Sequence, residues 1–170
     1  MVAVIQGRVW KFGEDINTDL MAPAVAMNLP FAEAIKYCFS ANRPGWAEQV
    51  KPGDIIVGGR NFGTGSSRPA AQVLKGLGIT GLVAETINGL FLRNCVNFGL
   101  PALACAGVAG TFEEGDIAEV DFKAGRIINR TRDVTLTAPP LPDLLLRIID
   151  AGGVIPMLDA AGCLEPLPPK

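Results

Sequence analysis

The chain has 170 residues, 49% hydrophobic and 19% charged, which is enough apolar material for one buried core and excludes a disordered chain or a repeat array. Its formal net charge of −2, with lysines and arginines scattered along the sequence, argues against a nucleic-acid surface. No apolar stretch reaches the length of a spanning helix and the N-terminus lacks the features of a signal peptide, so we expect a cytoplasmic protein without a membrane segment.

The chain contains no histidine, which removes the commonest general base, the Ser-His-Asp triad and the usual metal ligand. Its four cysteines, Cys38, Cys95, Cys105 and Cys163, form no C-x-x-C pair, so the sequence predicts neither a zinc site nor a self-contained iron–sulfur site. We expect buried free thiols and no metal bound by this chain. Any chemistry must use Ser, Asp, Arg or Lys, or a partner.

The first part of the chain predicts one strand, a long loop and one helix. Residues 2–10 alternate enough to form a strand, and the polar loop 11–19 follows it. Asp19, at the end of that loop, is favoured by its local sequence as a turn or capping residue. Apolar residues at helical spacing predict a helix over 31–40, which ends before the break NRPGW.

The middle of the chain alternates strands and helices. Short apolar runs predict strands at 55–57, 79–84 and 102–105. Between them, two segments have helical apolar faces: the first is carried by Val73, Leu74 and Leu77 and ends near Gly76 or Gly78, and the second spans 87–98 with Leu90, Phe91, Cys95 and Val96 inward. This alternation predicts a parallel sheet with right-handed crossovers.

The stretch 58–68, GGRNFGTGSSR, follows the first of these strands and leads into a helix that Pro69 suits. Glycines expose backbone N–H groups and Arg68 offers a bidentate fork, so the loop suits an anionic ligand at the carboxyl end of a strand. A tight turn without a ligand would have the same composition. The loop lacks the third glycine of G-x-G-x-x-G and no G-K-[ST] follows, which argues against nucleotide binding.

The last part of the chain changes in style. IAEVDF, IINRT and VTLTA have the period of two that is typical of antiparallel strands. An amphipathic helix is predicted over 143–151, ended by Gly152 and Gly153, and residues 164–170 are expected to form a flexible tail. We expect a single domain over residues 1–170.

Several segments together, in this order and spacing, carry a resemblance to a known family: INTDLMAP, KPGDIIV, NFGTGSSR, FLRNCVNFGLPAL and IDAGGVIPML. The chain resembles the small subunit of 3-isopropylmalate dehydratase, which is similar to the swivelling domain of aconitase. The resemblance covers nearly the whole chain. It implies an α/β fold of the swivelling-domain type, β/β/α, with a parallel sheet core and additional antiparallel strands.

The resemblance also implies a role for the chain in leucine and other branched-chain amino acid biosynthesis. In that family a large subunit carries a [4Fe–4S] cluster, and the small subunit supplies the loop Gly-Ser-Ser-Arg. Here Ser66 would be the base at carbon, Ser67 and Arg68 with Gly65 would hold a substrate carboxylate, and Asp19 would lie near the active site. Backbone donors and a guanidinium would be needed to lower the pKa of a serine for such a role.

Three departures from the family bear on the substrate. Pro69 and Ala70 replace the usual Glu and His after the arginine, and Gly89 stands where an arginine is expected. The loop 25–29, which reads the far end of the substrate in the family, is apolar apart from one amide, with Met27 and Leu29 as the expected pocket wall. We therefore expect a 2-hydroxy dicarboxylate with an alkyl substituent. Arg43 is the cation that would contradict this expectation if it supplied a positive charge to the pocket.

Three alternatives remain open from the sequence. One is a related hydratase for a methyl-substituted malate or maleate. Another, from a different class, is a non-catalytic anion-binding or regulatory module that uses the same loop. A stand-alone enzyme is the least favoured, because the chain lacks histidine and cluster-spaced cysteines.

Overall fold

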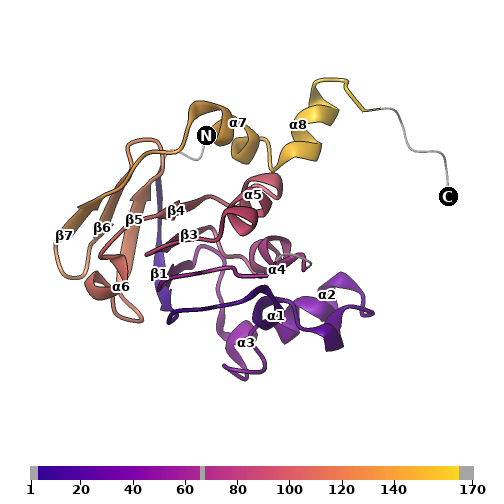
Figure 1. Ribbon diagram of the computed structural model, residues 1–170, viewed down its shortest axis with the longest axis horizontal. Helices are drawn as coiled ribbons and strands as arrows, with labels where there is room; N and C mark the ends of the chain where they lie inside the picture. Colours follow the sequence, from indigo (N-terminus) through magenta and orange to yellow (C-terminus); the bar gives the residue numbers. More distant parts are fainter. Residues whose placement is uncertain (1–3, 66–67, 165–170) are drawn as a thin grey trace.

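One sheet runs through the residues that this computed structural model describes, 4–65 and 68–164 (Figure 1). Within them, seven strands lie in the order β4-β3-β2-β1-β5-β6-β7. They are β1 (Val4–Lys11), β2 (Ile55–Gly58), β3 (Gly81–Ala84), β4 (Ala102–Ala104), β5 (Ile117–Asp121), β6 (Arg126–Asn129) and β7 (Val134–Thr137). β1 pairs in parallel with β2 and antiparallel with β5, so it joins the two halves. The predicted parallel core with added antiparallel strands is confirmed.

The helices are short and follow the strands. They are α1 (Thr18–Met21), α2 (Phe31–Ala34), α3 (Trp46–Gln49), α4 (Ala70–Gly76), α5 (Gly89–Asn97), α6 (Val108–Thr111), α7 (Asp143–Asp150) and α8 (Val154–Ala160), with 3-10 turns η1 (Ala24–Ala26) and η2 (Ile35–Tyr37). The predicted helices that correspond to α4, α5 and α7 are confirmed within a few residues. The sequence did not predict α1, α3, α6 or α8. Leu90 was wrongly expected to face inward: it is 44% exposed at the start of α5.

The single helix predicted over 31–40 is wrong. α2 ends at Ala34, η2 follows, and Phe39 turns to a φ of 58°. The reason is packing, because Phe39 is fully buried, stacks on Phe12 at 4.2 Å between ring centroids and meets Trp46 edge-on at 4.9 Å. A continuing helix would carry Phe39 away from these rings, and burying a large aromatic outweighs one left-handed residue.

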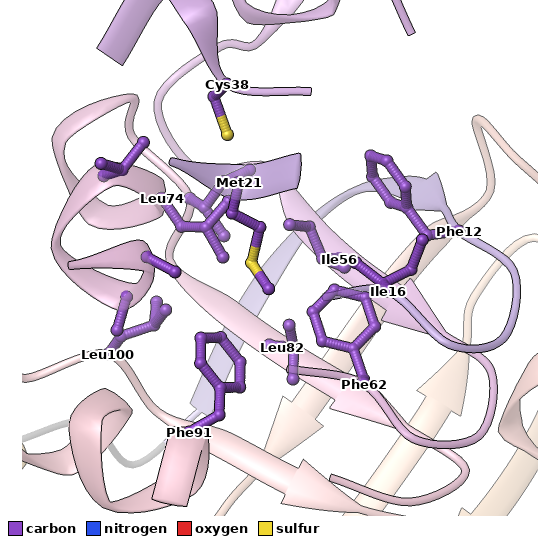
Figure 2. Close-up of a cluster of buried hydrophobic side chains, with 14 of the residues drawn as sticks. Phe12, Ile16, Met21, Cys38, Ile56, Phe62, Leu74, Leu82, Phe91 and Leu100 are labelled. Atoms are coloured by element: carbon purple, nitrogen blue, oxygen red, sulfur yellow. The ribbon is translucent and has the colours of Figure 1, made fainter. Parts of the chain in front are cut away.

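Both faces of β2 and β3 are buried, as is typical of strands inside a parallel sheet. Along β2, Ile56 faces the core that lies under α1, α4 and α5, while Ile55 and Val57 face the core under α6 and α7. Figure 2 shows the first of these cores, where Met21 from α1 and Phe91 from α5 lie together with Leu82 from β3. The alternation of side chains along each strand therefore anchors helices on both sides.

A buried carboxylate fastens the start of β2 to β1. Asp54 accepts hydrogen bonds from Arg8 Nη2 at 2.7 Å, Trp10 Nε1 at 2.7 Å and the backbone N–H of Lys51 at 2.9 Å. Burial alone raises the pKa of Asp54, but the hydrogen bonds from Arg8, Lys51 and Trp10 and the charge of Arg8 outweigh it and hold this pKa below its usual value. The carboxylate is thus ionised and paired in the fold.

Some predictions fall outside the described residues. Ser66 and Ser67 lie there, as do residues 165–170 of the tail expected over 164–170. In the part of the chain that the structure describes, no helix has the length and apolar character needed to cross a membrane.

Candidate active site

Three segments meet where β1, β2 and β3 end, at the carboxyl edge of the parallel strands. The segment after β2 lies between the other two: the N–H of Gly63 donates to the carbonyl of Ile16 at 2.7 Å, and the N–H of Asn88 donates to the carbonyl of Phe62 at 2.8 Å. Thr18 closes the set by donating its N–H to the carbonyl of Thr64 at 2.8 Å. The glycine loop therefore lies at the edge where open α/β sheets bind ligands, as predicted.

Gly63 and Gly65 of this loop have different reasons to be glycine. Gly63 has a φ of 83°, and a Cβ there would collide with the ring of Phe91. Gly65 has a φ of 79°, and its Cβ would lie 3.0 Å from Oγ1 of Thr18. The sequence left open a tight turn without a ligand, and at Gly63 such a turn is enough to explain the glycine. Gly65, in contrast, is exposed and directly precedes Ser66.

Asp19 and Arg68 come together across this edge. Arg68 Nε donates to Oδ1 of Asp19 at 2.9 Å, with the arginine side chain 19% exposed and the aspartate side chain 67% exposed. Asn17, not Asp19, caps α1, because its side chain accepts from the N–H of Leu20 at 3.0 Å. Asp19 lies in the first turn of α1, and its carboxylate accepts from Arg68. The capping role that the local sequence favoured for Asp19 is therefore filled by Asn17.

Arg68 contacts one of the side chains that line an apolar pocket of about 170 Å³. Its Nη1 contacts the sulfur of Met27, and Met27 lines the pocket together with Leu29, Phe31 and Val73. Met27 is 54% exposed and Leu29 is 38% exposed, so the pocket opens to the surface. An ion pair beside an apolar, open pocket can hold an anionic group and an alkyl group of one small molecule.

The supporting residues of the site belong to the buried core. Ile16 and Met21 flank Asp19 in sequence, and Phe62 and Leu74 flank Arg68. All four side chains lie in the cluster that Figure 2 draws. These buried side chains anchor α1 and both ends of the segment from Phe62 to Leu74 in the core.

The cysteines are not arranged as cluster ligands. Cys38, Cys95 and Cys105 are buried, and burial raises the pKa of each thiol. Among the described residues no group of three or more His, Cys, Asp and Glu side chains is gathered closely enough to hold a metal ion. These residues do not fit an iron–sulfur cluster, which needs several thiolates at one place.

Arg43 lies apart from the pocket. It pairs with Glu114, donates to the carbonyl of Lys11 at 3.3 Å, and its guanidinium lies 4.8 Å from the ring centroid of Trp10. Arg43 is therefore held against β1 and does not supply a positive charge to the loop 25–29.

Curated relatives match the chain over almost its full length. It is 42% identical over 160 residues to the isopropylmalate/citramalate isomerase small subunit of Methanocaldococcus jannaschii, a match that covers 93% of this chain and 95% of the relative. It is 40% identical over 161 residues to the 3-isopropylmalate dehydratase small subunit 1 of Methanopyrus kandleri, with coverage of 94% and 95%. The chain belongs to the 3-isopropylmalate dehydratase small-subunit family.

Structure and domain comparisons agree with this family. The crystal structure of 3-isopropylmalate dehydratase from Methanocaldococcus jannaschii superposes with a TM-score of 0.85 at 31% identity, covering 94% of this chain and 95% of that one. The Aconitase C-terminal domain matches residues 37–106, a range that includes the glycine loop. The predicted swivelling-domain fold and hydro-lyase class are thereby confirmed: this small-subunit family member is a hydro-lyase subunit of the aconitase type.

The departures from the family motif can now be placed. Pro69 lines the apolar pocket, and Ala70 is buried at the start of α4, so neither position offers a polar group to the site. Gly89 opens α5, where an added Cβ would meet nothing within 4 Å. The glycine at this position therefore leaves open space at the start of α5.

Sequence reasoning missed several residues that support the site. Phe31 and Val73 were assigned only to helix faces, and both line the pocket. Asp15, Asn61 and Thr86, which tie the three segments together, were not singled out. The available signal was a polar residue a few positions after the end of each strand, since such positions cluster at one edge of a parallel sheet.

Proposed function

We propose that this chain is the small subunit of a hydro-lyase that dehydrates and rehydrates a 2-hydroxy dicarboxylate with an alkyl substituent, of the 3-isopropylmalate type used in leucine biosynthesis. The observation that carries the proposal is the Asp19–Arg68 pair beside the apolar pocket lined by Met27. In this reading Arg68 grips a substrate carboxylate in bidentate fashion while the pocket receives the alkyl group.

Ser66 is proposed to remove or return the proton on the substrate carbon, with Ser67 and Gly65 assisting Arg68 at the carboxylate. The guanidinium of Arg68, two positions away in sequence, supplies positive charge that favours an alkoxide-like serine. The helix that follows has only seven residues, Ala70–Gly76, so its dipole contributes less than the guanidinium. Asp19 would orient Arg68 before the substrate binds.

A large subunit is proposed as the partner that completes the site. The relatives are named as small subunits, which implies such a partner. The segment 25–31, whose Met27 contacts Arg68, also carries exposed apolar side chains, with Val25 at 66%, Met27 at 54% and Phe31 at 45%. Such a patch is typical of an interaction surface. We propose that the large subunit holds a [4Fe–4S] cluster, which would supply a Lewis acid for the substrate hydroxyl.

The closest competing substrate is a methyl-substituted malate. One relative is named an isopropylmalate/citramalate isomerase small subunit, so a smaller alkyl group is compatible with the family. The pocket of about 170 Å³ has room for either substituent.

Reconstitution tests this function. The purified chain, treated alone with iron and sulfide, is expected to hold no stoichiometric cluster and to show no hydratase activity. Addition of a purified cluster-bearing large subunit from the same source is expected to give turnover of 3-isopropylmalate. The absorbance of the unsaturated product measures this turnover. A stable cluster or activity in the isolated chain would contradict the proposal. A complex that binds the dicarboxylate without turnover would favour the non-catalytic anion-binding module.

A further inference from the structure

Asn61 is bonded to both segments that flank the glycine loop. Its side-chain Nδ2 donates to Oδ1 of Asp15 at 2.9 Å, on the segment that leads from β1 to Asp19. Its backbone N–H donates to Oγ1 of Thr86 at 2.8 Å, on the segment that follows β3. Asn61, which follows β2, thus contacts both the segment after β1 and the segment after β3.

Asn61 and Asp15 also share an uncommon backbone conformation. Their φ angles are 55° and 57°, in the left-handed region that is unfavourable for residues with a Cβ. The N–H of Asp15 donates to the carbonyl of Arg60 at 2.8 Å, so the two left-handed residues are joined by backbone and by side chain. Asparagine and aspartate tolerate this region better than other non-glycine residues, but glycine would adopt it at lower cost. The side-chain hydrogen bond is what glycine could not supply.

The chain runs from Asn61 directly into the site. Phe62 is fully buried, and Gly63 and Thr64 are bonded to Ile16 and Thr18. Beyond Thr64 the loop is exposed at Gly65 and reaches Arg68, whose only described anchors are Asp19 and Met27. The direction in which the loop leaves the sheet edge is therefore set at the turn that Asn61 forms.

We propose that Asn61, with Asp15 and Thr86, is a positioning residue that fixes the course of the chain from Phe62 to Gly65, the stretch that leads to Ser66. This inference rests on the proposed function, because it assigns the positioned loop to the same reaction. A shift of about 1 Å in a reacting group can cost on the order of 100-fold in rate. Asn61 touches no reacting atom in this scheme and acts through the loop.

The kinetic test uses the complex with the large subunit. Asn61→Gly keeps the left-handed backbone without strain and removes the side chain, so it is expected to lower kcat about 10-fold to 100-fold. KM is expected to change less than about threefold, because Arg68 keeps its pair with Asp19. Asn61→Asp places a carboxylate against Asp15 and is expected to lower kcat at least as far. The exchanged pair Asp15→Asn with Asn61→Asp restores a donor and an acceptor and is expected to return kcat to within about threefold of wild type.

The control variant is Asp133→Gly. Asp133 also has a φ of 55°, lies exposed between β6 and β7, and is remote in the sheet from the site. This variant removes the strain of a left-handed residue with a Cβ, as Asn61→Gly does, and is expected to keep wild-type kinetics. A wild-type kcat for Asn61→Gly, or an exchanged pair no better than Asn61→Asp alone, would overturn the positioning role.

Hydrogen exchange in the chain without its partner gives a readout that does not depend on turnover. In Asn61→Gly the amides of Gly63 and Thr18 are expected to exchange at least 10-fold faster, while those of β6 stay unchanged. Unchanged exchange at Gly63 and Thr18 would overturn the inference by itself. If the wild-type complex shows no turnover, the proposed function fails, and the exchange rates alone decide whether Asn61 holds the loop.

Discussion

Arg68 and Asp19 are joined by a hydrogen bond of 2.9 Å from Nε to Oδ1, although 49 positions separate them in the sequence. The contact links the loop after β2 to helix α1. It leaves Asp19 the more exposed partner, at 67% against 19% for the arginine side chain. A partly buried guanidinium that is already oriented by one carboxylate is suited to receive a second from a substrate.

Replacing Arg68 by lysine is expected to raise KM and to lower kcat in the assembled complex, with a loss in kcat/KM on the order of 100-fold. A point charge cannot reproduce the planar fork that bonds Asp19 and a substrate carboxylate together. Steady-state kinetics with 3-isopropylmalate measure both constants. Arg60→Lys is the matched control, because Arg60 is 73% exposed and lies 3.6 Å from Glu14. Equal, wild-type-like kinetics for both variants would leave Arg68 without a role in binding.

Replacing Ser66 by alanine is expected to depress kcat by about 100-fold or more and to change KM little. The hydroxyl is proposed to act on the proton in the transition state, whereas the carboxylate grip of Arg68 is kept. The same kinetics measure the effect, with Ser40→Ala as a control serine outside the loop. A variant with unchanged kcat but raised KM would move Ser66 from catalysis to substrate binding.

Much of the fold could be predicted from local sequence. Ile55 and Val57 lie in a short apolar run bounded by turn residues, and such runs identified β2, β3 and β4. The place of β1 between β2 and β5 could not be predicted in this way, because strand order depends on pairings distant in sequence. The failed helix over 31–40 has the same origin: Phe39 turns to reach Phe12 and Trp46, and periodicity contains no record of those partners.

The site shows the same division. Composition and the family resemblance singled out Arg68 and Asp19, but local rules assigned Asp19 to a turn because its partner lies in another segment. Asn61 and Asp15 were not recognised, since a hydrogen bond between two side chains 46 positions apart leaves no local pattern. Residues that act through tertiary contacts are the ones that sequence reasoning misses.

Replacing Asp54 by asparagine is expected to lower the free energy of unfolding by about 2 kcal/mol at pH 7, because it weakens the hydrogen bonds that this buried carboxylate accepts from the partly exposed Arg8 and from Trp10. The folded pKa of Asp54 is depressed, so the stability it contributes is present above its unfolded pKa, near 4, and is lost as pH falls through the folded value. Wild type and Asp54→Asn should therefore converge in acid.

Urea unfolding between pH 7 and pH 3 measures this difference. Glu33→Gln is the surface control, since Glu33 pairs with Lys36 at 3.3 Å with both side chains exposed, and it is expected to cost less than about 1 kcal/mol. A constant difference between wild type and Asp54→Asn across this pH range would show that the ionised carboxylate is not the stabilising form.

Substrate choice depends on the pocket beside Arg68. Leu29 and Phe31 line it with other apolar side chains, and Arg43 is bound to Glu114 instead of facing it. Arg68 would already hold one substrate carboxylate, so a further carboxylate in this apolar pocket would lack a cation and cost several kcal/mol, whereas burying a branched alkyl group gains about 1.5 to 3 kcal/mol. We therefore expect the complex to prefer alkyl-substituted malates over tricarboxylates such as citrate.

The comparison of kcat/KM for 3-isopropylmalate, a methylmalate and citrate tests this preference directly. Leu29→Arg introduces a cation at the pocket and is expected to lower kcat/KM for 3-isopropylmalate at least 10-fold while raising that for citrate. Arg43→Ala is expected to leave the ratio between substrates unchanged, because its guanidinium is held over Trp10 and away from the pocket. A wild-type preference for citrate that disappears in Arg43→Ala would show that this arginine reaches the substrate, and the apolar pocket would then not decide specificity.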